Sequence, residues 1–154
     1  MSSIVALPPP AALTLGERLR GLTALAAARV ILTATNARPG PLRRALTPYA
    51  VARPAGRAQA ERAFTVITIL HPRCGGDTGC LLRSIAVAMF CRTAGTWPTW
   101  RSGVRYPPLH SHAWIEVDGR PVGEPAHLIA TYTPTITITA HSTTTTGGAS
   151  RHDR

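Results

Sequence analysis

Residues 79–95 read GCLLRSIAVAMFCRTAG, and the helix that they predict decides the fold. From Cys80 to Thr93 nearly every position is apolar, so this helix belongs in the centre of a domain and not on its surface. Gly95 stands where helices commonly end. The glycine-rich segment His71 to Gly79 predicts a loop before the helix. A cysteine is therefore expected at the first position of a buried helix.

Helical patterns come before this segment and strand patterns come after it. Thr14 and Glu17 form a predicted capping box at the start of a first helix, which ends at the proline-rich segment 36–41. Two further helical segments are expected at Leu42–Ala52 and Ala58–Ile69. Four strands are expected at Thr99–Tyr106, His110–Val117, Arg120–Glu124 and Pro134–Ala140. This order predicts an α+β domain in which an antiparallel sheet packs on the central helix.

Cys80 is the candidate nucleophile. The unpaired backbone N–H groups and the positive dipole end at a helix start favour thiolate over thiol, and they can stabilise an oxyanion. The alternative for Cys80 is a small buried core residue, as free cysteines often are. We expect that structural role for Cys91, deep inside the helix, and nothing in the sequence requires more of Cys74.

His112 is the candidate base, with Glu124 as the carboxylate that orients it. Strand alternation places His112 on the same face as Trp114 and Glu116. A two-residue loop at 118–119 would turn Glu124 away from His112, whereas a three-residue loop with a bulge would place the two opposite each other. A functional Glu124 therefore predicts the bulged hairpin. His110 is a competing base, but it has no visible orienting partner.

The chain of 154 residues carries a net charge of +10 with arginine as its only strong base, since it contains no lysine. The arginines are dispersed and accompany no nucleic-acid-binding motif, so an acidic peptide or protein partner is the better explanation. No pair of cysteines is spaced for zinc, and no metal or cofactor is expected. The apolar run 22–35 is interrupted by Arg29 and is too short to span a membrane. Three cysteines without a secretion signal favour the cytoplasm.

Four regions are expected along the chain. Residues 1–12 are a disordered lead-in, and 13–56 form an N-terminal helical region that could dock a partner or a leader peptide. Residues 57–141 are the expected catalytic core, and 142–154 are a threonine- and glycine-rich tail expected to be disordered.

The sequence resembles the transglutaminase-like cysteine proteases of lasso-peptide biosynthesis. The matching segments are Gly79–Ala86 (GCLLRSIA), Gly95–Trp100 (GTWPTW), Gly103–Arg105 (GVR), His112–Glu116 (HAWIE) with Asp118-Gly119, and Pro121–Pro125 (PVGEP). The resemblance implies a papain-like core and places the family's nucleophile on Cys80 and its base on His112. The third member of the triad, commonly aspartate in the family, falls on Glu124.

The resemblance also implies a reaction and partners. A small winged-helix protein would hold the leader of a ribosomally made precursor peptide, this chain would cut at the leader–core junction, and an ATP-dependent cyclase would then close the ring. The family favours a threonine just before the cut, although no residue here can be assigned to read it. Two alternatives remain open: an acyl transferase of the transglutaminase or amidase type, and a leader-binding module without catalytic activity.

Overall fold

The computed structural model describes residues 12–75 and 79–142. Helices and short strands make up the first half: α1 (Leu15–Thr35), α2 (Pro39–Leu46), the 3₁₀ turn η1 (Thr47–Ala50), β1 (Arg53–Pro54), α3 (Arg57–Leu70), η2 (Pro72–Gly75) and α4 (Cys80–Arg92). The second half contains β2 (Thr96–Trp97), β3 (Thr99–Arg105), β4 (His110–Val117), β5 (Arg120–Pro121), α5 (Ala126–Ile129) and β6 (Thr133–Ile138). The expected α+β class, with helices first and an antiparallel sheet afterwards, is confirmed.

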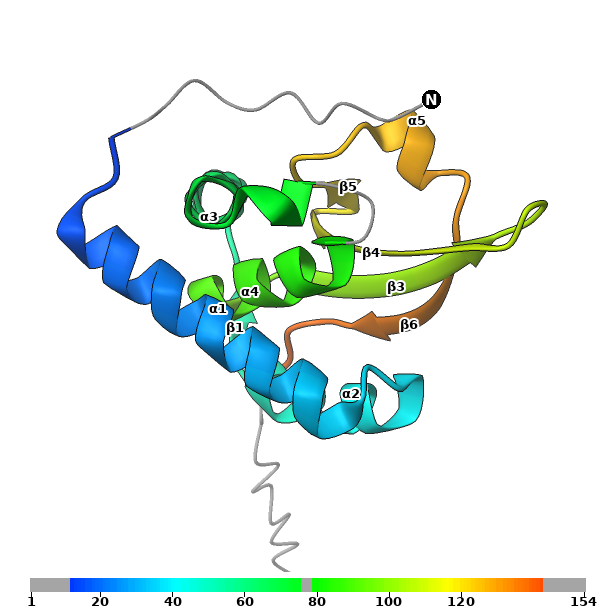
Figure 1. Ribbon diagram of the computed structural model, residues 1–154, viewed down its shortest axis with the longest axis horizontal. Helices are drawn as coiled ribbons and strands as arrows, with labels where there is room; N and C mark the ends of the chain where they lie inside the picture. The colour runs from blue at the N-terminus through cyan, green and yellow to red at the C-terminus, as the bar shows by residue number, and fades with distance from the viewer. Residues whose placement is uncertain (1–11, 76–78, 143–154) are drawn as a thin grey trace, which may run out of the picture.

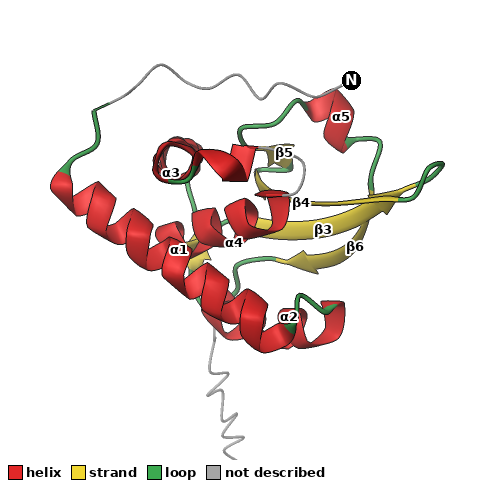
Figure 2. Ribbon diagram, in the orientation of Figure 1, coloured by secondary structure: helices red, strands yellow, loops and turns green. Residues whose placement is uncertain are grey.

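Helix α4 lies at the centre of the molecule, as its all-round apolar sequence predicts (Figure 1). Helices α1 and α3 pack on it from one side, and β4 contacts it from the other. Figure 2 shows this division between the helical layer and the sheet. One hydrophobic core runs through α1, α2, α3, α4 and the sheet, so the expected N-terminal helical region and the expected catalytic core share the same interior.

The main sheet has the strand order β5-β4-β3-β6, and every neighbouring pair is antiparallel. Trp100 of β3 and Trp114 of β4 are fully buried, as is Trp97 of β2, which pairs with β1 in a separate two-stranded parallel sheet. A bulge interrupts the pairing of β3 with β6 at Ser102 and Gly103. A side chain at Gly103 would meet the Thr133 carbonyl oxygen at 2.5 Å, so the close approach of β6 requires glycine there.

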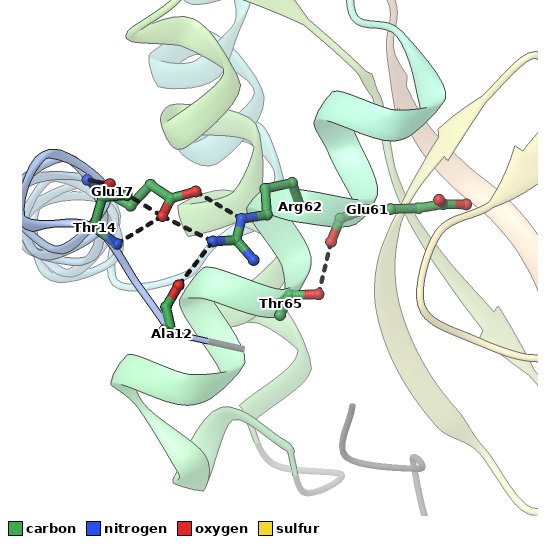
Figure 3. A network of polar contacts seen from close by, with 6 residues as sticks. All are labelled: Ala12, Thr14, Glu17, Glu61, Arg62 and Thr65. Carbon is green, nitrogen blue, oxygen red and sulfur yellow. Dashed lines mark hydrogen bonds and ion pairs between the residues drawn. The ribbon is translucent and has the colours of Figure 1, made fainter. Parts of the chain in front are cut away.

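The predicted capping box at the start of α1 is present. The Glu17 amide donates to the Thr14 hydroxyl at 3.2 Å, and the Thr14 amide donates to the Glu17 carboxylate at 2.9 Å. Arg62 of α3 adds two charge-assisted hydrogen bonds to the same carboxylate, at 2.6 and 2.8 Å (Figure 3). The first turn of α1 is therefore fastened to α3.

Three boundaries differ from the expected ones by about three residues or more. Pro39 does not belong to a linker but occupies the first turn of α2, where its missing N–H costs nothing. That helix ends at Leu46 and continues to Ala50 as a 3₁₀ turn. The strand expected over 120–124 stops at Pro121, because Gly123 adopts a left-handed φ of 72° that no extended strand allows.

The predicted bulged hairpin is also wrong. Val117 pairs with Arg120 and Glu116 with Pro121, which leaves Asp118 and Gly119 as a two-residue loop. Both loop residues have positive φ, 52° and 71°, as a type I′ turn requires. An Asp-Gly pair satisfies that turn directly, so the hairpin needs no extra residue.

None of the described helices combines the length and the apolarity needed to cross a bilayer. Both termini were expected to be disordered. Residues 1–11 and 143–154, which make up nearly all of them, lie outside the described residues.

Candidate active site

Cys80 begins α4 and is buried, as the sequence predicted. Gly79 caps the helix without a side-chain hydrogen bond, so no side chain occupies the first backbone N–H groups from that position. Cys80 also receives a hydrogen bond from the backbone N–H of Ala113 in β4. The sulfur therefore sits between the start of the central helix and the neighbouring strand.

His112 lies on β4 beside Cys80 and forms a hydrogen bond with its sulfur. Its other neighbour is Glu124, whose Oε2 lies 2.5 Å from His112 Nε2. Because Nε2 is engaged by the carboxylate, Nδ1 is the ring nitrogen left for Cys80. Tyr132 and Trp114 pack against the imidazole, with ring centroids 5.2 and 6.1 Å away, and fix its plane. The three candidate residues thus form one connected chain, Cys80–His112–Glu124.

Glu124 reaches His112 by a route that the sequence analysis did not foresee. In the two-residue-loop register a continued β5 would have placed Glu124 opposite Ala113, facing away from His112. The ladder instead ends with a hydrogen bond from the Val122 amide to the Ile115 carbonyl oxygen at 3.0 Å. Gly123 then turns the chain out of the sheet, and it packs so closely on Phe64 that a Cβ would lie 2.5 Å from the ring. Glu124 follows this turn.

Arg83 is a site residue to which the sequence analysis gave no role. Its Nη2 donates to Glu124 Oε1 at 2.7 Å, and both side chains are buried. The guanidinium also lies over the Phe64 ring, 5.3 Å from its centroid. One carboxylate therefore joins His112 and Arg83. The sequence did contain a signal for this role of Arg83, because a charged side chain inside a buried helix requires a partner. Arg83 also lies three residues after Cys80 and so on the same face of the helix.

These contacts set the charge state of the site. Burial acts to raise the pKa of the Cys80 thiol, but the hydrogen bonds from His112 and Ala113 and the charges of His112 and Arg83 outweigh it, and the pKa lies below its ordinary value. Burial acts to lower the pKa of His112, but its bonds to Cys80 and Glu124 and their negative charges raise it to about 9. Both shifts favour the thiolate–imidazolium pair over the neutral thiol and imidazole.

The other candidates of the sequence analysis are not part of this group. Cys91 is fully buried in the core, and burial raises its pKa to about 12, which confirms its structural role. His110 is exposed at the start of β4, and its side chain forms no hydrogen bond with any described residue. Glu116, on the same face of β4 as His112, pairs with Arg101 at 3.3 Å and accepts a hydrogen bond from Trp114, so it is an ion-paired strand residue. The side chain of Cys74 lies outside the described residues.

A cavity of about 180 Å³ opens beside Cys80 and His112. Its remaining lining is mostly small or apolar and comes from the α1–α2 turn and from α2, α4, β3, β4 and β6: Ala37, Pro39, Leu42, Leu81, Ser102, Ser111, Ala113 and Ile136. A pocket of this kind suits one uncharged side chain of a substrate held next to the sulfur. Within the described ranges no cluster of three or more His, Cys, Asp or Glu could hold a metal ion.

The thiol on a helix, the imidazole on a strand and the orienting carboxylate agree with the comparison against family models. The model of the transglutaminase-like superfamily matches residues 13–137. The chain belongs to the transglutaminase-like superfamily. This superfamily includes cysteine proteases with Cys-His-Asp triads. No curated protein and no solved structure is similar enough to this transglutaminase-like chain to count as a match.

The superfamily match begins just before α1 and ends in β6. It therefore includes the N-terminal helices together with the sheet, in agreement with the single hydrophobic core. The α+β architecture of helices on an antiparallel sheet is that of a transglutaminase-like domain.

Proposed function

We propose that this chain is a cysteine peptidase that removes the leader from a ribosomally synthesised lasso-peptide precursor. In this proposal it acts in the cytoplasm with a small winged-helix protein that holds the leader and passes the product to an ATP-dependent cyclase. The observation that carries the catalytic part is the connected set Cys80–His112–Glu124 at the start of the buried helix. The leader-peptide part rests on the sequence motifs that resemble lasso-peptide proteases.

The geometry supports a thioester mechanism. The Cys80 thiolate attacks the carbonyl carbon at the leader–core junction, and the new oxyanion faces the N–H groups at the start of α4. The imidazolium of His112 gives its proton to the leaving amine, and the released peptide carries the new N-terminus. Neutral His112 then removes a proton from water, whose oxygen attacks the thioester and frees the Cys80 sulfur. Glu124 holds the imidazole in orientation throughout.

The cavity beside Cys80 supports a peptide substrate. Its volume of about 180 Å³ is enough for one medium-sized side chain, and its lining offers two serine hydroxyls among apolar groups. It would receive an uncharged residue on the acyl side of the scissile bond. A binding module without catalytic activity would gain nothing from a thiol paired with a buried imidazole, so the pairing favours the enzyme over that alternative.

Cleavage followed by mass spectrometry tests the proposal. The chain, the leader-binding protein encoded beside its gene and the neighbouring precursor would be mixed, and the fragments identified. We expect one cut at the leader–core junction, abolished by Cys80→Ala and His112→Ala and weakened by Glu124→Ala. Cys91→Ala and His110→Ala are the matched controls and should cleave as the unaltered chain does. Cleavage that survives Cys80→Ala would overturn the proposal.

The same reaction run with a primary amine separates a peptidase from an acyl transferase. A peptidase gives a leader with a free carboxylate, whereas an acyl transferase gives a leader joined to the amine. If the leader–amine product exceeds the free leader even at low amine concentration, the result would support the transglutaminase-type alternative.

A further inference from the structure

Helix α1 carries an apolar surface that the rest of the described chain does not cover. Leu15, Leu19, Leu22 and Val30 are 74, 58, 54 and 66% exposed. With exposed Ala26 they define the α1 stripe, whose members fall within about 80° of one another around a helix of 3.6 residues per turn. From Leu15 to Val30 the stripe is about 22 Å long. Scattered exposed leucines need no explanation, but an aligned set does.

The stripe is not the face that α1 uses for folding. The buried residues of the helix, Gly21, Ala24, Leu25, Ala28, Ile31 and Thr35, lie on the opposite side and pack toward α3 and α4. The first turn is held to α3 by the paired hydrogen bonds between Arg62 and Glu17 (Figure 3). Figure 1 shows α1 running along the outside of the molecule. The stripe therefore lies on the exposed side of α1, while the opposite side of the helix packs on the rest of the protein.

Charge indicates what kind of surface the stripe would meet. Arg18 and Arg29 are exposed along one border of the stripe, and neither forms an ion pair with any described residue. The described glutamates offer them no partner, because each of the four is already paired with another arginine: Glu17 with Arg62, Glu61 with Arg57, Glu116 with Arg101 and Glu124 with Arg83. The other described carboxylate, Asp118, stands in the turn between β4 and β5 and forms no ion pair with Arg18 or Arg29. A second copy would bring a further net charge of +10. An acidic partner would neutralise it.

We propose that the α1 stripe docks a separate protein whose contact face combines an apolar ridge with carboxylates along one edge. The apolar ridge covers Leu15, Leu19 and Leu22, and the carboxylates meet Arg18 and Arg29. The stripe is distinct from the cavity beside Cys80, so docking leaves the nucleophile open to a peptide. The inference rests on the proposed function for the identity of this protein, which is the leader-binding partner.

The test measures binding of the leader-binding protein encoded beside the gene of this chain, by titration calorimetry with the full-length chain. The stripe variant is Leu15→Gln/Leu19→Gln/Leu22→Gln, and Leu19→Gln alone is a milder version. Glutamine is a good helix former, so α1 is expected to persist at these exposed positions. Leu109→Gln is the matched control, since Leu109 is an equally exposed leucine outside α1. Circular dichroism and the rate of Cys80 alkylation by iodoacetamide report whether fold and site are intact.

We expect the stripe variant to raise the Kd about tenfold or more, while Leu109→Gln leaves it unchanged. Arg18→Gln/Arg29→Gln should weaken binding and reduce its dependence on salt, because two screened ion pairs are lost. In all of these variants iodoacetamide should alkylate Cys80 at the same rate as in the unaltered chain.

Three results would overturn the proposal. One is an unchanged Kd for the stripe variant. Another is the absence of binding by the unaltered chain. The third is sedimentation that shows a dimer of the chain which the stripe variant dissociates, because a second copy would then be the occupant. Failure of the peptidase proposal can be told apart from failure of the docking proposal. If the unaltered chain does not cleave the precursor but binds the partner through the stripe, the peptidase proposal is wrong and the docking proposal stands. If it cleaves normally but the stripe variant binds as well as the unaltered chain, the docking proposal is wrong and the peptidase proposal stands.

Discussion

His112 Nε2 lies 2.5 Å from Glu124 Oε2, although Glu124 stands three residues beyond the last residue of the strand paired with β4. The contact does not come from the sheet register, which would have turned Glu124 away. It comes from the turn at Gly123, packed on Phe64, and from Arg83, which holds the other carboxylate oxygen. The orienting acid is thus positioned by side chains of α3 and α4.

The pH dependence of peptide cleavage should follow the two ends of the thiolate–imidazolium pair. The lowered pKa of Cys80 sets the acid limb, and the pKa of His112, raised to about 9, sets the alkaline limb. Glu124→Gln removes the negative charge that favours the imidazolium, so we expect the alkaline limb to move to lower pH. The profile of kcat/KM checks this. An alkaline limb that stays in place would contradict the assigned role of Glu124.

Arg83→Met should damage both stability and reactivity. It leaves a buried carboxylate with one partner fewer, and breaking a buried pair in this way costs about 3–5 kcal/mol. It also removes a positive charge that favours the Cys80 thiolate, so the pKa of Cys80 should rise. The acid limb of the pH profile for alkylation of Cys80 should therefore move to higher pH. Arg83→Lys keeps the charge and should retain part of the stability and part of the thiol reactivity. Arg120→Met, at an exposed position, is the control; equal effects from Arg83→Met and Arg120→Met in melting and alkylation experiments would refute the assignment.

Gly123→Ala should separate the acid from the imidazole. The position needs a φ of 72° and has no room for a Cβ, which would lie 2.5 Å from the Phe64 ring. We expect a large fall in kcat, of about a hundredfold, because a small displacement of an orienting group has that effect. Gly119→Ala has a similar φ of 71° but open space around it, so it controls for backbone strain alone. Equal kcat values for the two variants would argue against the packing explanation.

Ser111→Val should narrow the cavity beside Cys80 without touching the reacting groups. Peptides with a larger residue at the pocket should lose about tenfold in kcat/KM, the size of effect that one methylene has in a fitted pocket. Alkylation of Cys80 by iodoacetamide should stay unchanged, because that reagent does not need the pocket. Thr137→Val, on an exposed position of β6, is the control. A uniform loss for small and large residues would show that the cavity does not select side chains.

The contact between Glu17 and Arg62 should make thermal stability depend on acid pH. The hydrogen bonds from Arg62 lower the pKa of Glu17 from 4.5 to about 2. A lowered carboxyl pKa stabilises the fold above the unfolded value of 4.5, and that contribution is lost as the pH falls through about 2. Glu17→Gln keeps the capping box but loses the charge, so its melting temperature should lie below that of the unaltered chain at pH 7 and converge with it near pH 2. A constant difference across this range would exclude the ion pair as the cause.

The sequence was sufficient for features that depend on local patterns. The apolar segment 80–93 predicted the buried helix, Thr14 and Glu17 predicted the start of α1, and alternation along His112–Val117 predicted the strand and its faces. Cys80, His112 and Glu124 were named as a group, and the structure brings them together.

Features that depend on long-range packing could not be predicted from such patterns. The hairpin was wrong because its prediction assumed that Glu124 must face His112 across a ladder, whereas the chain leaves the ladder at Gly123. That departure depends on the Phe64 ring of α3, far away in sequence. The same holds for the cavity, whose lining residues come from separate elements.

Ala37, in the turn between α1 and α2, and Pro39, at the start of α2, lie in the wall of the cavity beside Cys80. Part of the selectivity of the site is therefore encoded well upstream of the nucleophile, outside the segments that hold the reacting groups. A chimera that grafts residues 79–125 onto a related scaffold would carry over the chemistry but inherit the host's pocket wall. For the proposed peptidase, engineering a new cleavage preference has to include Ala37, Pro39 and Leu42 as well as the triad.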